Sequence, residues 1–139
     1  MAKHSSGRRK YRLIYERHAF RPHDLLTFVE LRSFTKAWDD MGLTDDDLNT
    51  LQIGIMAMPK AAPVVAGTGG LRKIRFAPVG WSKGKSGALR ACYVHFEDHG
   101  IVLLVLVYRK NERDDLSASE KRSIRRLIQE AEKELAKAR

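Results

Sequence analysis

A short section of the chain carries a run of positive charge that could bind a phosphate backbone. Between Leu71 and Tyr93 the sequence has six Lys or Arg residues and no Asp or Glu. A solvated surface usually mixes both signs, so a strip of one sign indicates a polyanionic partner. Apolar and basic residues alternate up to Phe76, as in a strand, which places Lys73 and Arg75 side by side on one face. A strand whose exposed face is basic by chance is the alternative.

The residues after this strand resemble a phosphate-binding loop, but the match fails. The run Gly-Lys-Ser at 84–86 matches the end of that motif, which also needs a glycine five residues earlier, where Val79 stands. The motif must lead into a helix, whereas a strand is expected here. We interpret the segment as a loop in which Trp81 stacks on a base and Lys83 and Lys85 contact phosphates. Packing of Trp81 against the edge of the core is an equal alternative.

Composition limits the classes of partner and compartment. The chain has 139 residues, a formal net charge of +9 and a pI of about 9.9, which fits one domain that binds nucleic acid or an anionic membrane surface. No apolar run approaches the roughly 18 residues of a spanning helix, and no apolar segment of a signal peptide follows the basic start. Cys92 is the only cysteine and is expected to be buried. These features predict a cytoplasmic protein.

The first 24 residues differ from the rest of the chain. They carry seven Lys or Arg against two acids, and their few hydrophobic residues show little periodicity. We expect a flexible basic extension (1–24) in front of a single domain (25–139). Two other interpretations are a leader translated from a start codon placed too far upstream and a basic arm that adds sequence-independent RNA affinity.

The remaining patterns predict an α+β fold. Thr44 precedes three aspartates that suit the positive end of a helix dipole, so these carboxylates need no metal. Ser117 and Glu120 form a capping box, and the apolar run 101–107 is expected in the centre of the sheet. We expect a small, mostly antiparallel four-stranded sheet with helices packed on it, in the order strand (25–31), helix (34–40), helix (44–59), strands (71–76, 88–96 and 100–108, the last two joined by a turn) and a helix from 117.

Amphipathic stripes indicate how the helices pack. Ser33 is expected to cap the first helix, in which Phe34 and Trp38 lie on one side. The last helix is expected to pack on the sheet or on a partner and to lie outside the RNA site. The stripes of the second and last helices are Leu48, Leu51, Ile55 and Met58, and Ile124, Leu127, Ile128, Ala131 and Leu135.

Three motifs in this order resemble the RelE/HigB family of toxins from type II toxin–antitoxin systems. They are Gly-Thr-Gly-Gly-Leu-Arg-Lys-Ile-Arg (67–75), Gly-Lys-Ser-Gly-Ala-Leu-Arg (84–90) and Val-Tyr-Arg-Lys-Asn-Glu-Arg-Asp-Asp-Leu (107–116), and 34–59 is similar as well. The resemblance implies a RelE-like microbial RNase fold, in the order β-α-α-β-β-β-α, that cuts mRNA in the A site of the small ribosomal subunit. It also implies a cognate helix-turn-helix antitoxin, no cofactor, no membrane and a toxin that is monomeric when free.

The resemblance also implies a catalytic set. Cleavage needs a base for the 2′-OH, positive charge for the pentacoordinate phosphate and an acid for the 5′-oxygen. Motif matching assigns Lys73 and Arg75 to the family's paired basic positions, Arg90 to the next strand and Lys110 to the position after the last strand. A lysine crowded by other cations loses its proton more easily and can serve as base. The arginines would stabilise phosphate charge, and Lys110 would be the acid or simply a positive charge.

Other residues are expected to hold the RNA or to stand apart from it. His95 and His99, the only histidines of the domain, lie at the expected hairpin tip and are interpreted as non-catalytic. Leu116 replaces a tyrosine that stacks on the substrate base in some relatives; Tyr108 and Tyr93 are possible substitutes, although Tyr93 also fits the core. The expected RNA-binding residues are Arg72, Trp81, Lys83, Lys85, Tyr108 and Arg109.

Three other functions fit the sequence. A basic face can bind RNA or the ribosome without cutting. A relative that poisons gyrase on the same fold would not need the basic cluster on the two strands. A folded but inactive product of a degraded locus is the third.

Overall fold

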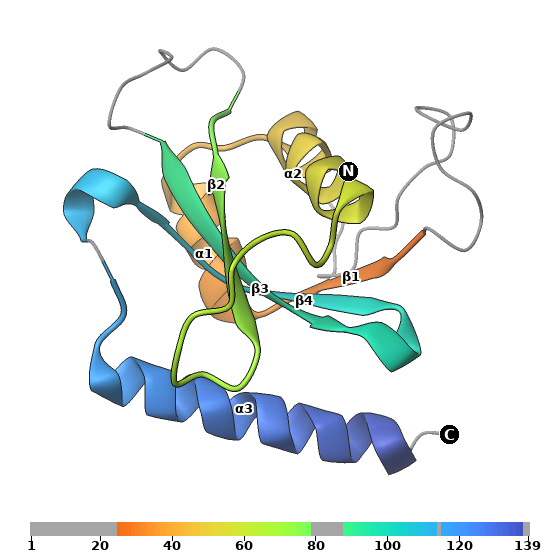
Figure 1. The fold of residues 1–139 in the computed structure, drawn as a ribbon. Helices are drawn as coiled ribbons and strands as arrows, with labels where there is room; N and C mark the ends of the chain where they lie inside the picture. Colours follow the sequence, from red (N-terminus) through yellow and green to blue (C-terminus); the bar gives the residue numbers. More distant parts are fainter. Residues whose placement is uncertain (1–24, 79–87, 114, 138–139) are drawn as a thin grey trace.

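The computed structural model describes residues 25–78, 88–113 and 115–137. Three helices and an open four-stranded sheet form an α+β fold (Figure 1). The α+β class and the four-stranded sheet with helices on it are confirmed. The elements are β1 (Thr27–Glu30), α1 (Arg32–Asp40), α2 (Asp45–Ala57), β2 (Leu71–Phe76), β3 (Leu89–Phe96), η2 (Glu97–His99), β4 (Ile101–Arg109), η3 (Lys110–Glu112) and α3 (Ala118–Lys137).

The sheet is mixed, which corrects the expectation of a mostly antiparallel one. The strand order is β1-β4-β3-β2, with β4 antiparallel to β3, β3 antiparallel to β2, and β1 parallel to β4. The parallel pair is possible because the chain from β1 runs through two helices and two further strands before it returns as β4. As predicted, β4 lies inside the sheet and is buried along most of its length.

Helices α1 and α2 cover one face of the sheet. The stacked rings of Phe34 and Trp38, 5.4 Å apart, lie in this core as predicted, and Trp38 also stacks on Phe76 of β2. The Trp38 indole Nε1 donates to the carbonyl of Thr44, which ties α1 to the start of α2. Thr44 caps α2 as predicted, and the structure adds reciprocal hydrogen bonds between Thr44 and Asp47.

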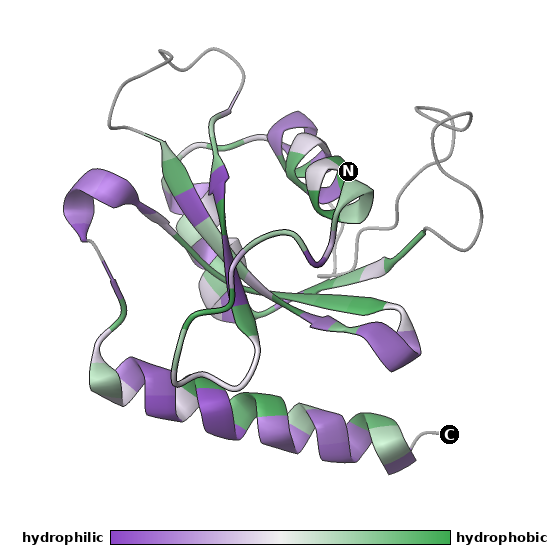
Figure 2. Ribbon diagram, viewed as in Figure 1, coloured by the Kyte–Doolittle hydropathy of each residue, from purple (hydrophilic) through white to green (hydrophobic). Residues whose placement is uncertain are grey.

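Helix α3 covers the other face (Figure 1). The predicted stripe faces the sheet: Ile124 and Ile128 are buried, and Leu127, Ala131 and Leu135 pack partly against them. Figure 2 shows the result as a helix that is hydrophilic over much of its length with hydrophobic residues interspersed. The Ser117–Glu120 capping box forms as predicted. Cys92 is buried in the same core.

Two local predictions were wrong. Ser33 does not cap α1, because the helix begins at Arg32, two residues earlier than expected, with Leu31 at the N-cap position. The Ser33 hydroxyl instead donates to the carbonyl of Val105 at 2.9 Å. Met58 does not continue the buried stripe of α2: the helix ends at Ala57 and Met58 is 58 % exposed, while Met56 is buried.

A β-bulge interrupts β4. Cys92 pairs with Leu106 and Tyr93 with Leu104, which leaves Val105 without a partner on β3. Val105 and Leu106 therefore both face α3, and the alternation of faces along β4 reverses from there onward. As a result Tyr108 faces α3, whereas an uninterrupted strand would turn it toward α1 and α2.

The two edges of the sheet differ. The outer edge of β2 bonds to the preceding segment: Lys73 N donates to the carbonyl of Pro63, and Val65 N to that of Leu71. The other edge, β1, has four residues.

A glycine-rich turn at 67–70 leads into β2 and lies against α3. Gly67 and Gly69 have φ values of +85° and +81°, a region that other residues rarely adopt, and a Cβ atom at these positions would contact the side chains of Lys121 and Arg125, respectively. Thr68 is fully buried; its hydroxyl accepts from the amide of Leu71 and donates to the carbonyl of Val65. In the described part of the chain, none of the helices has the length and apolar character needed to cross a membrane.

One buried side chain lowers stability. Gln52 of α2 is fully buried, and neither its Nε2 nor its Oε1 has a hydrogen-bond partner. An unsatisfied buried amide costs free energy, so Gln52→Leu should raise the free energy of unfolding by about 1–2 kcal/mol. Urea unfolding measures this, with Gln129→Leu at an exposed position of α3 as the control. A Gln52→Leu variant less stable than the parent would contradict the prediction.

Candidate nucleic-acid interface

Three side chains form a row across the sheet on the face that α3 partly covers. Arg75 of β2 lies directly opposite Arg90 of β3, and Arg90 lies opposite Tyr108 of β4. The two arginines make no ion pair with any carboxylate that the structure describes. Like charges placed opposite each other on neighbouring strands destabilise a sheet. The pair is thus better suited to binding an anion than to supporting the fold.

Lys73 lies one pair farther along the same face. The Lys73 Nζ is 4.0 Å from Oδ1 of Asp115, and Lys121 of α3 approaches the other carboxylate oxygen at 3.6 Å. The pKa of Asp115 is lowered, first by the hydrogen bond from the amide of Leu116 and then by these two lysines. Asp115 therefore stays charged at neutral pH and holds Lys73 beside the two arginines.

Arg113 adds a cation that was not among the predicted site residues. Its Nη1 lies 2.9 Å from both carboxylate oxygens of Glu120, and its Cζ lies 4.8 Å from the centre of the Tyr108 ring. Glu120 is the acid of the capping box, so the start of α3 also positions Arg113. Arg113 and Glu120 are seven residues apart across a loop, and no periodic pattern in the sequence links them. The sequence therefore predicted that α3 lies outside the site. In the structure, the first turn of α3 adjoins the basic row.

The described residues that were considered for base stacking are buried. Tyr93 is fully buried and its hydroxyl donates to the carbonyl of Pro59, so it belongs to the core, as the alternative held. Leu116 is buried beneath α3. Tyr108 is 6 % exposed, and burial raises its pKa to about 12. Arg113 lies over its ring, so the ring itself offers little surface to a base.

Three other predicted residues lie in different surroundings. Arg72 faces the opposite side of the sheet from Lys73, and its Nη1 donates to the carbonyls of Lys60 and Ala62, which fixes the chain between α2 and β2. Arg109 follows Tyr108 on the opposite face and lies 3.6 Å from a Glu112 oxygen. Lys110 is exposed. Its amide donates to the carbonyl of Ala88, just before β3, and this backbone hydrogen bond places Lys110 next to the row. The predicted contacts of Trp81, Lys83 and Lys85 lie outside the described residues.

The histidines are far from this row. His95 and His99 lie at the β3–β4 hairpin, at the opposite end of the sheet from η3 (Figures 1 and 2). Burial lowers the pKa of His95, which favours its neutral form at pH 7. Their position agrees with the interpretation that they do not act on a substrate at the basic row.

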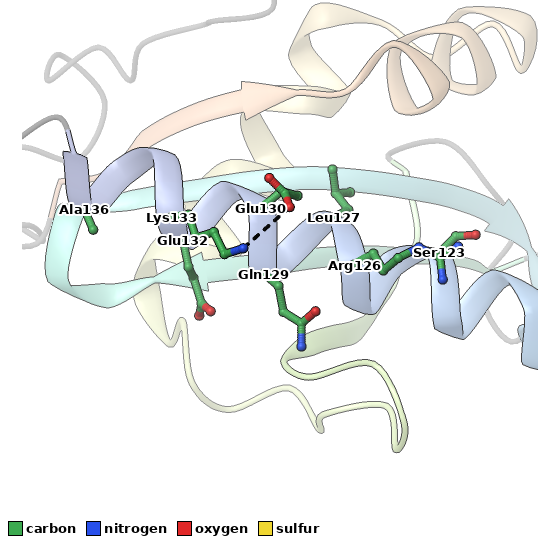
Figure 3. A pocket seen from close by; sticks show the side chains of 8 residues that line it. All are labelled: Ser123, Arg126, Leu127, Gln129, Glu130, Glu132, Lys133 and Ala136. Atoms are coloured by element: carbon green, nitrogen blue, oxygen red, sulfur yellow. Dashed lines mark ion pairs between the residues drawn. The ribbon is translucent and has the colours of Figure 1, made fainter.

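Two cavities among the described residues lie away from the basic row. One, of about 930 Å³, lies on the outer side of α3 and is lined by that helix, with Lys133 paired to Glu130 (Figure 3). A groove of about 560 Å³ runs beside the hairpin and the second half of α3. In the part of the chain that the structure describes, no three His, Cys, Asp or Glu side chains gather as they would around a metal ion.

The arrangement can bind and stabilise a phosphate. Arg75, Arg90 and Lys73 supply positive charge on one face, and Tyr108 and Arg113 close one end of the row.

No protein-family model matches the sequence. The RelE/HigB resemblance therefore remains a prediction based on its motifs.

The Arg113–Glu120 pair predicts a dependence of stability on pH. The pKa of Glu120 is below its usual 4.5, first because the Ser117 amide donates to it and then because of Arg113. A lowered pKa stabilises the fold above the unfolded value, and that contribution is lost as the pH falls through the folded value. Glu120→Gln should thus be less stable at neutral pH and should lose less stability between about pH 5 and pH 3. Urea unfolding over this range tests it. Glu134→Gln, at an exposed position of α3, should follow the parent.

Proposed function

We propose that the protein is the toxin of a toxin–antitoxin pair and cuts mRNA in the A site of the ribosome. The observation that carries the proposal is the row of Arg75, Arg90 and Tyr108 with Lys73 beside it, because it gathers cations that no described carboxylate fully neutralises. The three motifs that resemble the RelE/HigB family supply two of these strands and the segment after β4. An α+β fold with helices on both faces of a four-stranded sheet is compatible with that family's fold.

In the proposed reaction the nucleophile belongs to the RNA. The 2′-oxygen of the nucleotide before the cut attacks the phosphorus and forms a cyclic phosphate, while the bond to the 5′-oxygen breaks. A base takes the proton of the 2′-OH, and an acid gives a proton to the leaving 5′-oxygen. Arg75 and Arg90 stabilise the extra negative charge of the pentacoordinate phosphate. Among the described side chains, we assign Lys73 and the exposed Lys110 as the groups that exchange protons with the sugar oxygens.

Binding without cleavage is the second candidate, and one observation favours it. The two described carboxylates beside the row belong to Asp115 and Glu120. Both have lowered pKa values and form ion pairs with Lys or Arg, so they are weak bases. Lys73 is held by Asp115. A face of this kind would block the A site by occupying it. Sequencing of mRNA ends in cells that express the protein separates the two functions, since only the nuclease produces new ends.

The arginine pair should be needed for activity and dispensable for the fold. We expect Arg75→Gln and Arg90→Gln each to weaken mRNA cleavage and growth arrest, by about 2–4 kcal/mol of transition-state stabilisation. Each should leave stability unchanged or raise it by about 0.2–1 kcal/mol, because one of two opposed like charges is removed. Lys73→Ala should also relieve growth arrest. Arg126→Gln, on the outer side of α3 (Figure 3), is the matched control. Undiminished toxicity of all three site variants would refute the assignment.

Cleavage should depend on the ribosome. Because the row holds no histidine and its carboxylates are already paired, the isolated protein is expected to cut free RNA hardly at all. The ribosome would orient the mRNA so that the 2′-OH is aligned with the phosphorus, which accounts for a large share of such a barrier. Purified protein with free transcript and with stalled ribosomes, compared on the same gel, tests this. Equal cleavage of both would indicate a free-standing ribonuclease.

A further inference from the structure

The guanidinium of Arg113 is held in place before any ligand arrives. Both oxygens of Glu120 accept from Nη1 at 2.9 Å, and the Tyr108 ring lies on one side at 4.8 Å. Glu120 is itself fixed, because the amide of Ser117 donates to it at 2.8 Å. Tyr108 is buried, so its ring cannot turn away without opening the core. A planar group supported from one edge and one side is preorganised for a second planar group.

The rest of Arg113 remains available. Its side chain is 32 % exposed, and among the described residues only Nη1 of the guanidinium forms hydrogen bonds. Glu120 already balances its charge, which distinguishes Arg113 from Arg75 and Arg90. What Arg113 adds to the row is therefore a flat, polarizable surface whose Nε and Nη2 nitrogens form no hydrogen bond with another described residue, rather than a further uncompensated positive charge.

The position of this surface relative to the arginine pair suggests its ligand. Tyr108 beneath Arg113 is the cross-strand neighbour of Arg90, which in turn faces Arg75. A phosphate bound by the pair would thus place a neighbouring nucleotide near Arg113. Bases of single-stranded RNA stack on arginine planes as well as on aromatic rings. Among the described candidates, Tyr93, Tyr108 and Leu116 are buried and offer little surface for this contact, whereas Arg113 presents a supported plane that is partly exposed.

We propose that Arg113, positioned by Glu120 and Tyr108, is the stacking platform for an unpaired base of the RNA next to the phosphate that Arg75 and Arg90 bind. This inference rests on the proposed function, since it requires that the basic row binds RNA. It assigns Glu120 and Tyr108 as positioning residues. It also explains how a chain with leucine at position 116 can hold a base without a stacking tyrosine there.

The test uses a short single-stranded RNA that cannot be cut, with 2′-O-methyl groups throughout and one 2-aminopurine whose fluorescence falls when it stacks. The probe is placed in turn at each position, and binding to the full chain is measured at low salt. With the parent protein, the fluorescence of 2-aminopurine should fall strongly at one position of the RNA. Arg113→Lys keeps the charge and can keep the ion pair with Glu120, but it lacks the plane. We expect it to bind roughly tenfold more weakly and to lose the quenching. Arg126→Lys should behave as the parent.

The outcomes separate this inference from the proposed function. Binding that falls with Arg75→Gln and Arg90→Gln, together with an Arg113→Lys variant that binds and quenches like the parent, would overturn the stacking role and leave the RNA-binding face intact. RNA binding that is indifferent to Arg75 and Arg90 would overturn both. Melting temperatures of all variants are compared first. If Arg113→Lys melts at a lower temperature than the parent, Glu120→Gln gives a second measure at a temperature where it is folded. Loss of the Glu120 carboxylate should release Arg113 and reduce the quenching more than the affinity for RNA. Unchanged quenching in Glu120→Gln would overturn the stacking role of Arg113.

Discussion

The bulge at Val105 is the constraint on which the candidate site depends. An extra residue in β4 brings Val105 and Leu106 to the same face and sends Tyr108 to the side of α3. With regular alternation, Tyr108 would enter the core beneath α1 and α2, and Arg90 would lose its neighbour in the row. The same irregularity leaves the carbonyl of Val105 to be bonded by Ser33 of α1, so the bulge is held from outside the strand. One inserted residue thus links α1 to the position of Tyr108, the ring on which Arg113 lies.

The balance of charges around the row is uneven along its length. Asp115 is shared between Lys73 and Lys121, and Glu120 binds Arg113, so these acids offset the charge of the cations beside the row. Arg75 and Arg90, within the row, face each other without such a partner among the described residues. The core formed by α1 and α2 on the reverse face keeps the strands in register despite this repulsion. An anion that arrives at the row therefore meets its least compensated cations at the Arg75–Arg90 pair.

The parts of the structure that depend on neighbouring residues could be predicted from the sequence. The caps at Thr44 and Ser117 are local hydrogen bonds with a fixed spacing, and the alternation from Leu71 to Phe76 correctly placed Lys73 and Arg75 on one face. What depends on distant partners could not be predicted. The parallel pairing of β1, the bulge and the use of Ser33 by Val105 are decided by contacts across the sheet. Arg72 looked like a surface cation because nothing local indicates that it bonds to the carbonyls of Lys60 and Ala62.

The closure of the sheet at β2 has a consequence for how copies of this protein meet. An open sheet with a bare edge is a template for strands of other molecules and promotes aggregation. Here the edge of β2 is already bonded by the segment around Pro63 and Val65, and proline itself has no amide hydrogen to offer a further strand. The opposite edge, β1, gives an incoming strand only four residues to pair with. Both edges of the folded sheet thus limit the addition of a strand from another molecule.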